Sequence, residues 1–468
     1  MEMDLTTLRA ESRRLAVELV KVLAARREIV NKIAEHKKTL GVEAVAPDVE
    51  KEVRRAMLEE AAKHGIPEET INRIATIIFS DAVEQQTSTP KQKLTHFDIL
   101  RRAVELQKNG REVQRLEVGE PDLGAPPEVR HSAANALLEG YARYIDSRGL
   151  AELRAQIVNQ VYEKHGFEIT PENVVITPGG RFAIYLAAKT LLREGDELLV
   201  IDPSWPMYRQ VAPFVGARSV HVKTLFEDGW TPSIDAVERH ISSSTKAIIL
   251  NYPNNPTGKI LDRTTFNKLV ELATDHGITV ISDEVYADYV RDGHVSILDN
   301  DLGKQHVLIQ SFSKSYGMTG YRIGYVIADK NLVAKMASII GLVITCVPEF
   351  IQRGALTALG LRDAPKEYAA IMMRRMEKAV HELEKIGAEF YRPDGGMYVF
   401  PRIGKLGEDA MATAFELLES KGVAVAPGSL FGGYDDFIRI SLGAPDESIV
   451  KGIRLLGEFI AEKGRARG

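Results

Sequence analysis

Short apolar runs alternate with helical patterns through the middle of this chain of 468 residues. The runs are rich in Val, Ile and Leu and lie at 174–177, 197–201, 247–250, 278–281 and 307–309. Alternation of strands and helices is typical of an α/β domain with a mostly parallel sheet. The sequence therefore predicts such a domain between about residues 133 and 335.

Polar segments follow two of these runs. The segment NYPNNPTG at 251–258 follows one apolar run, and Asp283 and Tyr286 lie just past another. Open α/β sheets bind ligands outside the carboxyl ends of their strands. We therefore expect a ligand site where these segments meet.

A lysine surrounded by hydroxyl groups and glycines indicates what that ligand is. Residues 311–325 read SFSKSYGMTGYRIGY. The Lys314 amine can bond covalently to an aldehyde, while the hydroxyls of Ser311 and Ser313 and the forked guanidinium of Arg322 suit a phosphate dianion. A bare Ser-x-Ser-Lys would be only a basic turn, but with the other segments this combination describes pyridoxal 5'-phosphate (PLP).

The polar segments supply partners for the ring of that cofactor. Asp283 can ion-pair with a protonated pyridine nitrogen, which keeps the ring an electron sink for a carbanion. Tyr286 and Asn255 can hydrogen-bond the ring's phenolic oxygen. We predict Lys314, Asp283 and Tyr286 as catalytic residues.

These motifs resemble, in order, those of the class I aminotransferases of PLP fold type I. The resemblance runs from about Leu94 to the C-terminus and rests on GEPD at 119–122, GLAELR at 149–154, TPGGR at 177–181, PSWPMY at 203–208 and RISL at 439–442. It implies a domain at 91–468, with a large mostly parallel-sheet part at about 130–340. The flanking segments would form a small α+β part.

The resemblance also implies further cofactor contacts. Gly180 and Arg181 open an expected helix, whose amino end would suit the phosphate. Trp205 would cover the ring face. Tyr144 would reach the cofactor phosphate of a neighbouring subunit, which implies a homodimer.

Substrate contacts follow from the same resemblance. Arg439 would clamp the α-carboxylate of the substrate, and Gly119 would lie in the substrate loop, with Asn255 and Trp205 also beside the substrate. Freed Lys314 would act as base and then as acid at the donor Cα. An amino acid and a 2-oxo acid would react in turn, in a ping-pong scheme.

The first 90 residues have a different pattern. A charged helical stretch runs over 4–40 without proline or glycine, and a stripe at helical spacing contains Leu8, Leu15, Leu19, Val22, Leu23, Ile29 and Ile33. A helix of about 35 residues is a rod of roughly 50 Å, which cannot bury its stripe alone. We expect a partner helix from another chain, and two shorter helices at 48–64 and 68–86.

One long and two short helices resemble the all-helical chorismate mutases, whose dimers interlock two chains. The resemblance implies an all-α three-helix domain at 1–90. Arg9 would reach the site of the partner chain. The other matching residues are Arg26, Lys37, Asp48, Glu52 and Gln85.

Chorismate is a dianion that rearranges in one concerted step, so its catalyst must hold two carboxylates and stabilise charge on the breaking ether oxygen. By resemblance, Arg26 holds a carboxylate. By the same resemblance, Lys37 and Gln85 would contact the ether oxygen, and Asp48 and Glu52 would lie near the hydroxyl of the substrate.

Two positions depart from the mutase pattern. Lys51 stands where the family usually has arginine, and Asp81 stands near a usual serine. Lys51 keeps the charge but loses the bidentate geometry. One alternative is a general aspartate or aromatic aminotransferase with an inactive helical oligomerisation or regulatory module. Another is a PLP-binding regulator, although no DNA-reading motif is recognisable.

Composition and charge argue against some classes of binding partner. The net charge of -5 and pI near 6.2 give no nucleic-acid footprint, and no uninterrupted apolar run reaches the roughly 20 residues that span a bilayer. Cys346 is the only cysteine, so we expect no disulfide framework and no cysteine-based zinc site. We also expect no other metal at the sites. The amino end does not read as a targeting signal, and we expect a cytoplasmic enzyme that uses chorismate, amino acids and 2-oxo acids.

Joining the two halves predicts a bifunctional enzyme of aromatic amino acid biosynthesis. The helical part would convert chorismate to prephenate. The PLP part would then transfer an amino group from glutamate or aspartate to prephenate or to an aromatic 2-oxo acid. The shared chain is the reason to connect the two steps, which is an association.

Overall fold

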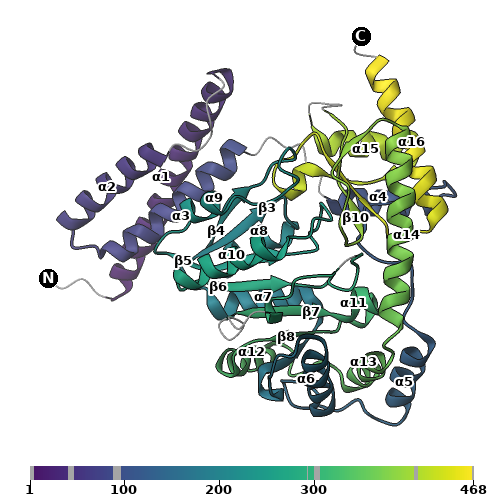
Figure 1. The fold of residues 1–468 in the computed structure, drawn as a ribbon. Helices are drawn as coiled ribbons and strands as arrows, with labels where there is room; N and C mark the ends of the chain where they lie inside the picture. Colours follow the sequence, from purple (N-terminus) through teal and green to yellow (C-terminus); the bar gives the residue numbers. More distant parts are fainter. Residues whose placement is uncertain are drawn as a thin grey trace. The chain divides into compact units, whose positions relative to one another are not determined.

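The computed structural model describes residues 5–40, 47–87, 96–291, 293–299, 306–404 and 409–465 (Figure 1). The chain forms two compact units, Met1–Lys93 and Leu94–Gly468. Each unit is described by itself. The expected linker at 87–95 lies almost entirely outside the described residues.

The first unit consists of the helices α1 (Leu5–Leu40), α2 (Pro47–Lys63) and α3 (Glu68–Thr87). Ile71, Ala75 and Phe79 recur at helical spacing on α3 and are buried against the other two helices. Arg54 joins α2 to α3, because its Nη1 donates to Asn72 Oδ1 at 3.0 Å. This core is small for three helices.

The apolar stripe of α1 stays exposed within the chain. Its members, exposed by 41 to 65%, are Leu8, Leu15, Leu19, Val22, Leu23, Ile29 and Ile33. An exposed stripe of this length fits the expected partner helix from another chain, which stays a prediction.

In the second unit, the described strands form a seven-stranded sheet in the order β2-β8-β7-β6-β5-β3-β4. The strands are β2 (Val174–Thr177), β3 (Glu197–Asp202), β4 (Arg218–Lys223), β5 (Thr245–Asn251), β6 (Thr279–Asp283), β7 (Val307–Ser311) and β8 (Gly324–Ile327). Strand β8 runs antiparallel to β2 and β7, and the other pairings are parallel. The predicted mostly parallel sheet is confirmed.

Both faces of the sheet are buried because helices cover each of them (Figure 1). Side chains alternate along a strand, so Val174 and Ile176 pack into one core and Val175 into the other. Helices α7 (Gly179–Leu191), α8 (Pro206–Phe214) and α12 (Lys330–Val343) cover the Val175 face. Helices α5 (Pro127–Leu138), α6 (Ala151–His165), α9 (Ile234–Arg239), α10 (Arg263–Asp275) and α13 (Glu349–Gly360) cover the opposite face.

A second layer of the same unit has its own core, which includes Leu116, Met376 and Ile440. Its helices are α4 (His96–Lys108), α14 (Ala364–Lys385), α15 (Ala410–Lys421) and α16 (Asp446–Arg465). Its short strands are β1 (Gln114–Arg115), β9 (Glu389–Phe390), β10 (Tyr398–Val399), β11 (Pro401–Arg402), β12 (Val423–Ala424), β13 (Ala426–Pro427) and β14 (Ile438–Ser441). The expected division near residue 340 stays a prediction; α13 packs with the sheet.

Short pairings in this layer bring distant segments together. Strand β1 pairs in parallel with β12, and Ser441 N of β14 donates to Leu116 O at 2.9 Å. The loop that contains Gly119 therefore lies beside Arg439. In the described residues, no helix is both long and apolar enough to cross a membrane.

Candidate active site

A cavity of about 620 Å³ lies between the carboxyl ends of β6 and β7 and the second layer. The structure brings most predicted residues of this unit to its lining: Gly119, Gly180, Arg181, Trp205, Asn255, Asp283, Tyr286, Ser311, Ser313, Lys314, Arg322 and Arg439. Tyr144 does not line the cavity, and its side chain is 85% exposed. Its expected role in a neighbouring subunit stays a prediction.

Lys314 lies on α11 (Phe312–Ser315), a short helical turn that follows β7. Its Nζ donates a short hydrogen bond to Gly119 O. Burial lowers the pKa of Lys314 to about 8, with Glu120 opposing the shift and Arg439 and Arg322 adding to it. About a tenth of the amine is therefore neutral at pH 7, far more than for an ordinary lysine, and only the neutral form acts as a nucleophile or base.

Asp283 ends β6 and is 2% exposed. Its Oδ2 accepts from Tyr208 Oη at 2.7 Å, and its Oδ1 accepts from Val285 N at 3.3 Å. Burial raises the pKa of Asp283 to about 6, although the two hydrogen bonds lower it. A buried carboxylate with so few donors is well suited to pair with a cationic nitrogen.

One end of the cavity can bind a phosphate dianion. Gly180 and Arg181 lie in the first turn of α7, which carries no acidic residue there. Ser311 Oγ donates to Ser313 Oγ at 2.9 Å, so the two hydroxyls lie together. Helix dipole, hydroxyls and the nearby Arg322 guanidinium all favour an anion.

Gly179 keeps this end of the cavity open. Its φ is +79°, and a Cβ there would lie 2.6 Å from Arg322 Nη2. Any side chain would displace the guanidinium from the first turn of α7. This crowded glycine, together with the anion-binding groups, shows that the residues present fit the phosphate of PLP.

Arg439 lies on β14 with 6% of its surface exposed. Nη1 donates to Asn255 Oδ1 at 3.0 Å and Nη2 to Glu117 O at 2.6 Å, while the Tyr398 ring lies 4.4 Å from the guanidinium carbon. These hydrogen-bond acceptors are neutral. A buried cation with neutral partners is poised for an anion such as a carboxylate.

Sequence reasoning missed Tyr208 and Tyr398. Tyr208 lies only three positions after Trp205 in a motif that was already singled out, and a hydroxyl so close to the ring-binding residue was an available signal. Tyr398 gave no local signal. It donates to or accepts from Tyr286 Oη at 2.8 Å, and a Cβ on Gly119 would lie 2.0 Å from its hydroxyl.

In the first unit, the structure describes a contact of the predicted mutase residue Arg26. Arg26 of α1 is partly buried, and its Nη1 donates to Ile78 O of α3 at 3.4 Å. Arg9 and Glu52 are exposed, as is Lys51. The side chains of Lys37, Asp48 and Gln85, and of Asp81, lie outside the described residues.

The lowered pKa of Lys314 leads to a pH prediction. In cofactor-free protein, labelling of Lys314 by an amine-directed acylating reagent should rise with a midpoint near 8, because only the neutral amine reacts and its pKa is about 8. Mass spectrometry after brief labelling across the pH range gives the curve. Exposed Lys330 on the same protein is the reference, and a Lys314 midpoint equal to that of Lys330 would contradict the prediction.

Known proteins match both units. A family model for class I and II aminotransferases matches residues 111–455, and one for chorismate mutase type II matches residues 8–87. The aspartate aminotransferase of Sulfurisphaera tokodaii is 33% identical over 84% of this chain and 96% of its own length. A probable aspartate/prephenate aminotransferase of Aquifex aeolicus is 34% identical over 78% of this chain and 95% of its own.

A solved structure shows the same fold in the second unit. The aspartate aminotransferase of Thermotoga maritima superposes with a TM-score of 0.75 at 33% identity, covering 79% of this chain and 97% of that one. The predicted fold class, the PLP cofactor and the fusion of the two families are confirmed. The chain belongs to the class I and II aminotransferases, which use PLP, and it carries a chorismate mutase type II domain ahead of the aminotransferase.

Proposed function

We propose that this chain is a bifunctional enzyme of aromatic amino acid biosynthesis. A mutase domain at 1–90 converts chorismate to prephenate, and an aminotransferase domain at 91–468 aminates prephenate or an aromatic 2-oxo acid. The observation that carries the proposal is the presence of both family matches on one chain. The name of the Aquifex aeolicus relative, which includes prephenate, supports the same acceptor.

In the aminotransferase domain, PLP when bound supplies a ring that withdraws electrons from the donor Cα. Lys314 Nζ takes the proton from that carbon, which a pKa of about 8 allows near neutral pH. Asp283 would hold the proton on the ring nitrogen, and Tyr208 orients the Asp283 carboxylate. Arg439 binds the α-carboxylate of donor and acceptor.

Other residues hold the cofactor and shield it. Ser311, Ser313 and Arg322 would hold the phosphate beside the first turn of α7, and Trp205 would cover the ring face. Asn255 can contact both the cofactor and the substrate. Its Oδ1 accepts a hydrogen bond from Arg439, and the residue lines the same cavity as Asp283. The walls of the cavity exclude water from the reacting carbon.

In the mutase domain the residues act by charge and shape. Arg26 holds one carboxylate of chorismate in the folded geometry, and Lys37 and Gln85 stabilise charge on the breaking oxygen. Glu52 and Asp48 bind near the hydroxyl, and Arg9 reaches the partner site. Rearrangement then needs no bond to the protein.

We also propose a homodimer. The apolar stripe of α1 is exposed, and in the second unit Leu138, Tyr144 and Leu342 are 84%, 85% and 88% exposed. Large apolar side chains with such high exposure support contact with a second copy. The cytoplasmic location stays a prediction.

An acceptor panel tests the function. With glutamate or aspartate as donor, kcat/KM for prephenate should exceed that for phenylpyruvate and 4-hydroxyphenylpyruvate by at least about 10-fold, because both lack the second carboxylate of prephenate and a site that binds a second polar group rejects acceptors without it. Oxaloacetate, which has a second carboxylate but no ring, is measured beside them. The full chain should also consume chorismate. Preference for oxaloacetate without chorismate turnover would instead favour a general aspartate aminotransferase with an inactive helical module.

A further inference from the structure

A buried carboxylate lies directly behind the residue assigned to the ring nitrogen. Glu284 follows Asp283 in the sequence and is 3% exposed. Because successive side chains leave an extended chain on opposite sides, Asp283 faces the cavity while Glu284 faces the other way. Glu284 does not line the cavity, and nothing in the reaction uses it.

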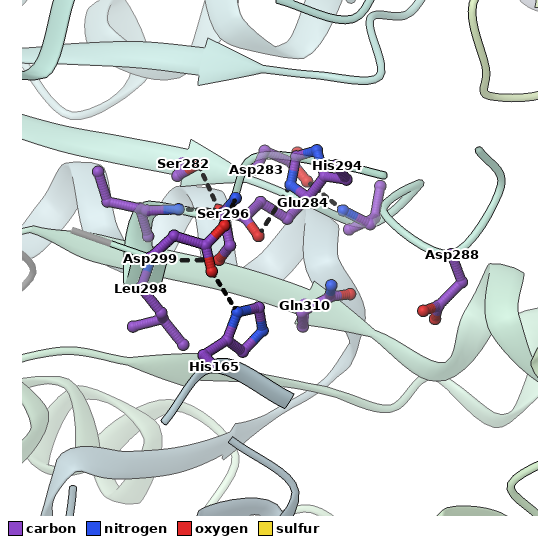
Figure 2. Close-up of polar contacts among 12 residues, drawn as sticks. His165, Ser282, Asp283, Glu284, Asp288, His294, Ser296, Leu298, Asp299 and Gln310 are labelled. Atoms are coloured by element: carbon purple, nitrogen blue, oxygen red, sulfur yellow. Dashed lines mark hydrogen bonds and ion pairs between the residues drawn. The ribbon is translucent and has the colours of Figure 1, made fainter. Parts of the chain in front are cut away.

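Glu284 is held at both of its oxygens (Figure 2). Oε1 accepts from Ser282 Oγ at 2.8 Å and from Ile297 N at 2.9 Å. Oε2 lies 3.1 Å from His294 Nε2, within reach of an ion pair with the protonated ring. Burial raises the pKa of Glu284, but His294, the Ile297 amide and Ser296 outweigh it and lower the pKa.

These contacts fix the backbone on both sides of Asp283. Ser282 precedes it, and Glu284 N donates to Ile309 O of β7, the strand that leads to Lys314. Val285 N, the next amide, donates to Asp283 Oδ1. A rotation of the backbone at Glu284 would therefore move Val285 N, which donates directly to the Asp283 carboxylate.

We propose that the Glu284–His294 pair is a positioning pair, which holds the Asp283 carboxylate in the orientation that the cofactor ring requires. The pair acts through Asp283 and touches neither cofactor nor substrate. This inference rests on the role proposed for Asp283.

A neighbouring ion pair provides the contrast. His165 Nδ1 lies 2.6 Å from Asp299 Oδ1, and Ser296 N donates to Asp299 Oδ2 at 3.0 Å (Figure 2). This pair ties Asp299, at the end of the segment 293–299, to α6. Its loss removes a His–carboxylate pair of the same kind but should leave the contacts of His294 and Ile297 N with Glu284 in place.

The test compares Glu284→Gln and His294→Gln with the control His165→Gln in the full-length protein. Titration of cofactor-free protein with PLP should give a dissociation constant raised about 10-fold for the first two, because a turned Asp283 carboxylate loses part of its ion pair with the ring nitrogen. In the loaded enzyme kcat should fall by about 10-fold with KM for the donor unchanged. His165→Gln should lower Tm but leave the dissociation constant and kcat as in the parent protein.

Each result decides between the explanations. Equal dissociation constants for Glu284→Gln, His294→Gln and His165→Gln would overturn the positioning role and leave a purely structural one. If Glu284→Gln does not fold, His294→Gln and Ser282→Ala carry the test. Asp283→Asn is the reference variant. If Asp283→Asn binds PLP and turns over like the parent protein, the role of Asp283 in the proposed function is wrong. If Asp283→Asn is impaired but Glu284→Gln and His294→Gln are not, the role of Asp283 stands and only the positioning pair is overturned.

Discussion

Replacing Lys314 by alanine should lower the turnover of amino transfer by about 10⁴-fold or more, because one side chain serves both as covalent anchor and as proton carrier at the donor Cα. Loss of a general base alone typically costs up to about 10⁴-fold. The measurement is the steady-state rate with glutamate as donor. The absorbance of the bound cofactor should also lose the band that depends on its bond to the lysine.

The same variant carries its own control. The mutase unit does not contain residue 314, so chorismate consumption by Lys314→Ala should equal that of the parent chain. Lys330→Ala removes an exposed lysine from the same unit and should leave amino transfer unchanged. Retention of a tenth or more of the parent rate in Lys314→Ala would show that another group anchors the cofactor.

Replacing Arg26 by alanine should lower kcat/KM for chorismate by about 10²- to 10³-fold, the usual loss when one preorganised donor to a developing or fixed negative charge is removed. Arg26 is partly buried against α3, where its Nη1 donates to Ile78 O. A guanidinium in that position is shielded from water on one side, so its attraction for a carboxylate is stronger than at the surface. Loss of chorismate absorbance gives the rate.

Arg14→Ala is the matched control for Arg26→Ala. It removes the same side chain from the same helix, but Arg14 is 58% exposed and paired with Glu11. Its loss should change mutase activity little, since exposed i,i+3 pairs contribute little to stability. Equal chorismate turnover by the two variants, with amino transfer intact in both, would show that Arg26 does not hold the substrate carboxylate.

The sheet could be predicted closely because its strands are apolar on both faces. The run at 174–177 became β2 without change of bounds, and the predicted strand at 247–250 became β5, Thr245–Asn251. The direction of each strand was harder to predict from the sequence. Strand β8 turns back antiparallel to β7 after a connection, residues 312–323, that contains short helical turns and no crossover helix, and the sequence analysis did not predict β8 as a strand.

The residues of the candidate site likewise divide into those that the sequence predicted and those that it did not. Lys314, Asp283 and Ser311 lie at ends of predicted strands, so local pattern and chemistry located them. Tyr398 lies 112 positions from the tyrosine that it contacts, and only the folding of the second layer onto the sheet brings the two together. Long-range contacts of this kind leave no periodic trace in the sequence.

The pairing of β1 with β12 has a consequence for biosynthesis of the protein. A ribosome releases the helices of residues 5–87 early, and they can collapse while translation continues. The Gly119 loop, by contrast, must wait for partners more than 300 positions downstream, since β14 supplies Arg439 close to the end of the nascent polypeptide. Premature termination before that strand would release a product with an intact amino-terminal helical unit and no assembled transamination centre.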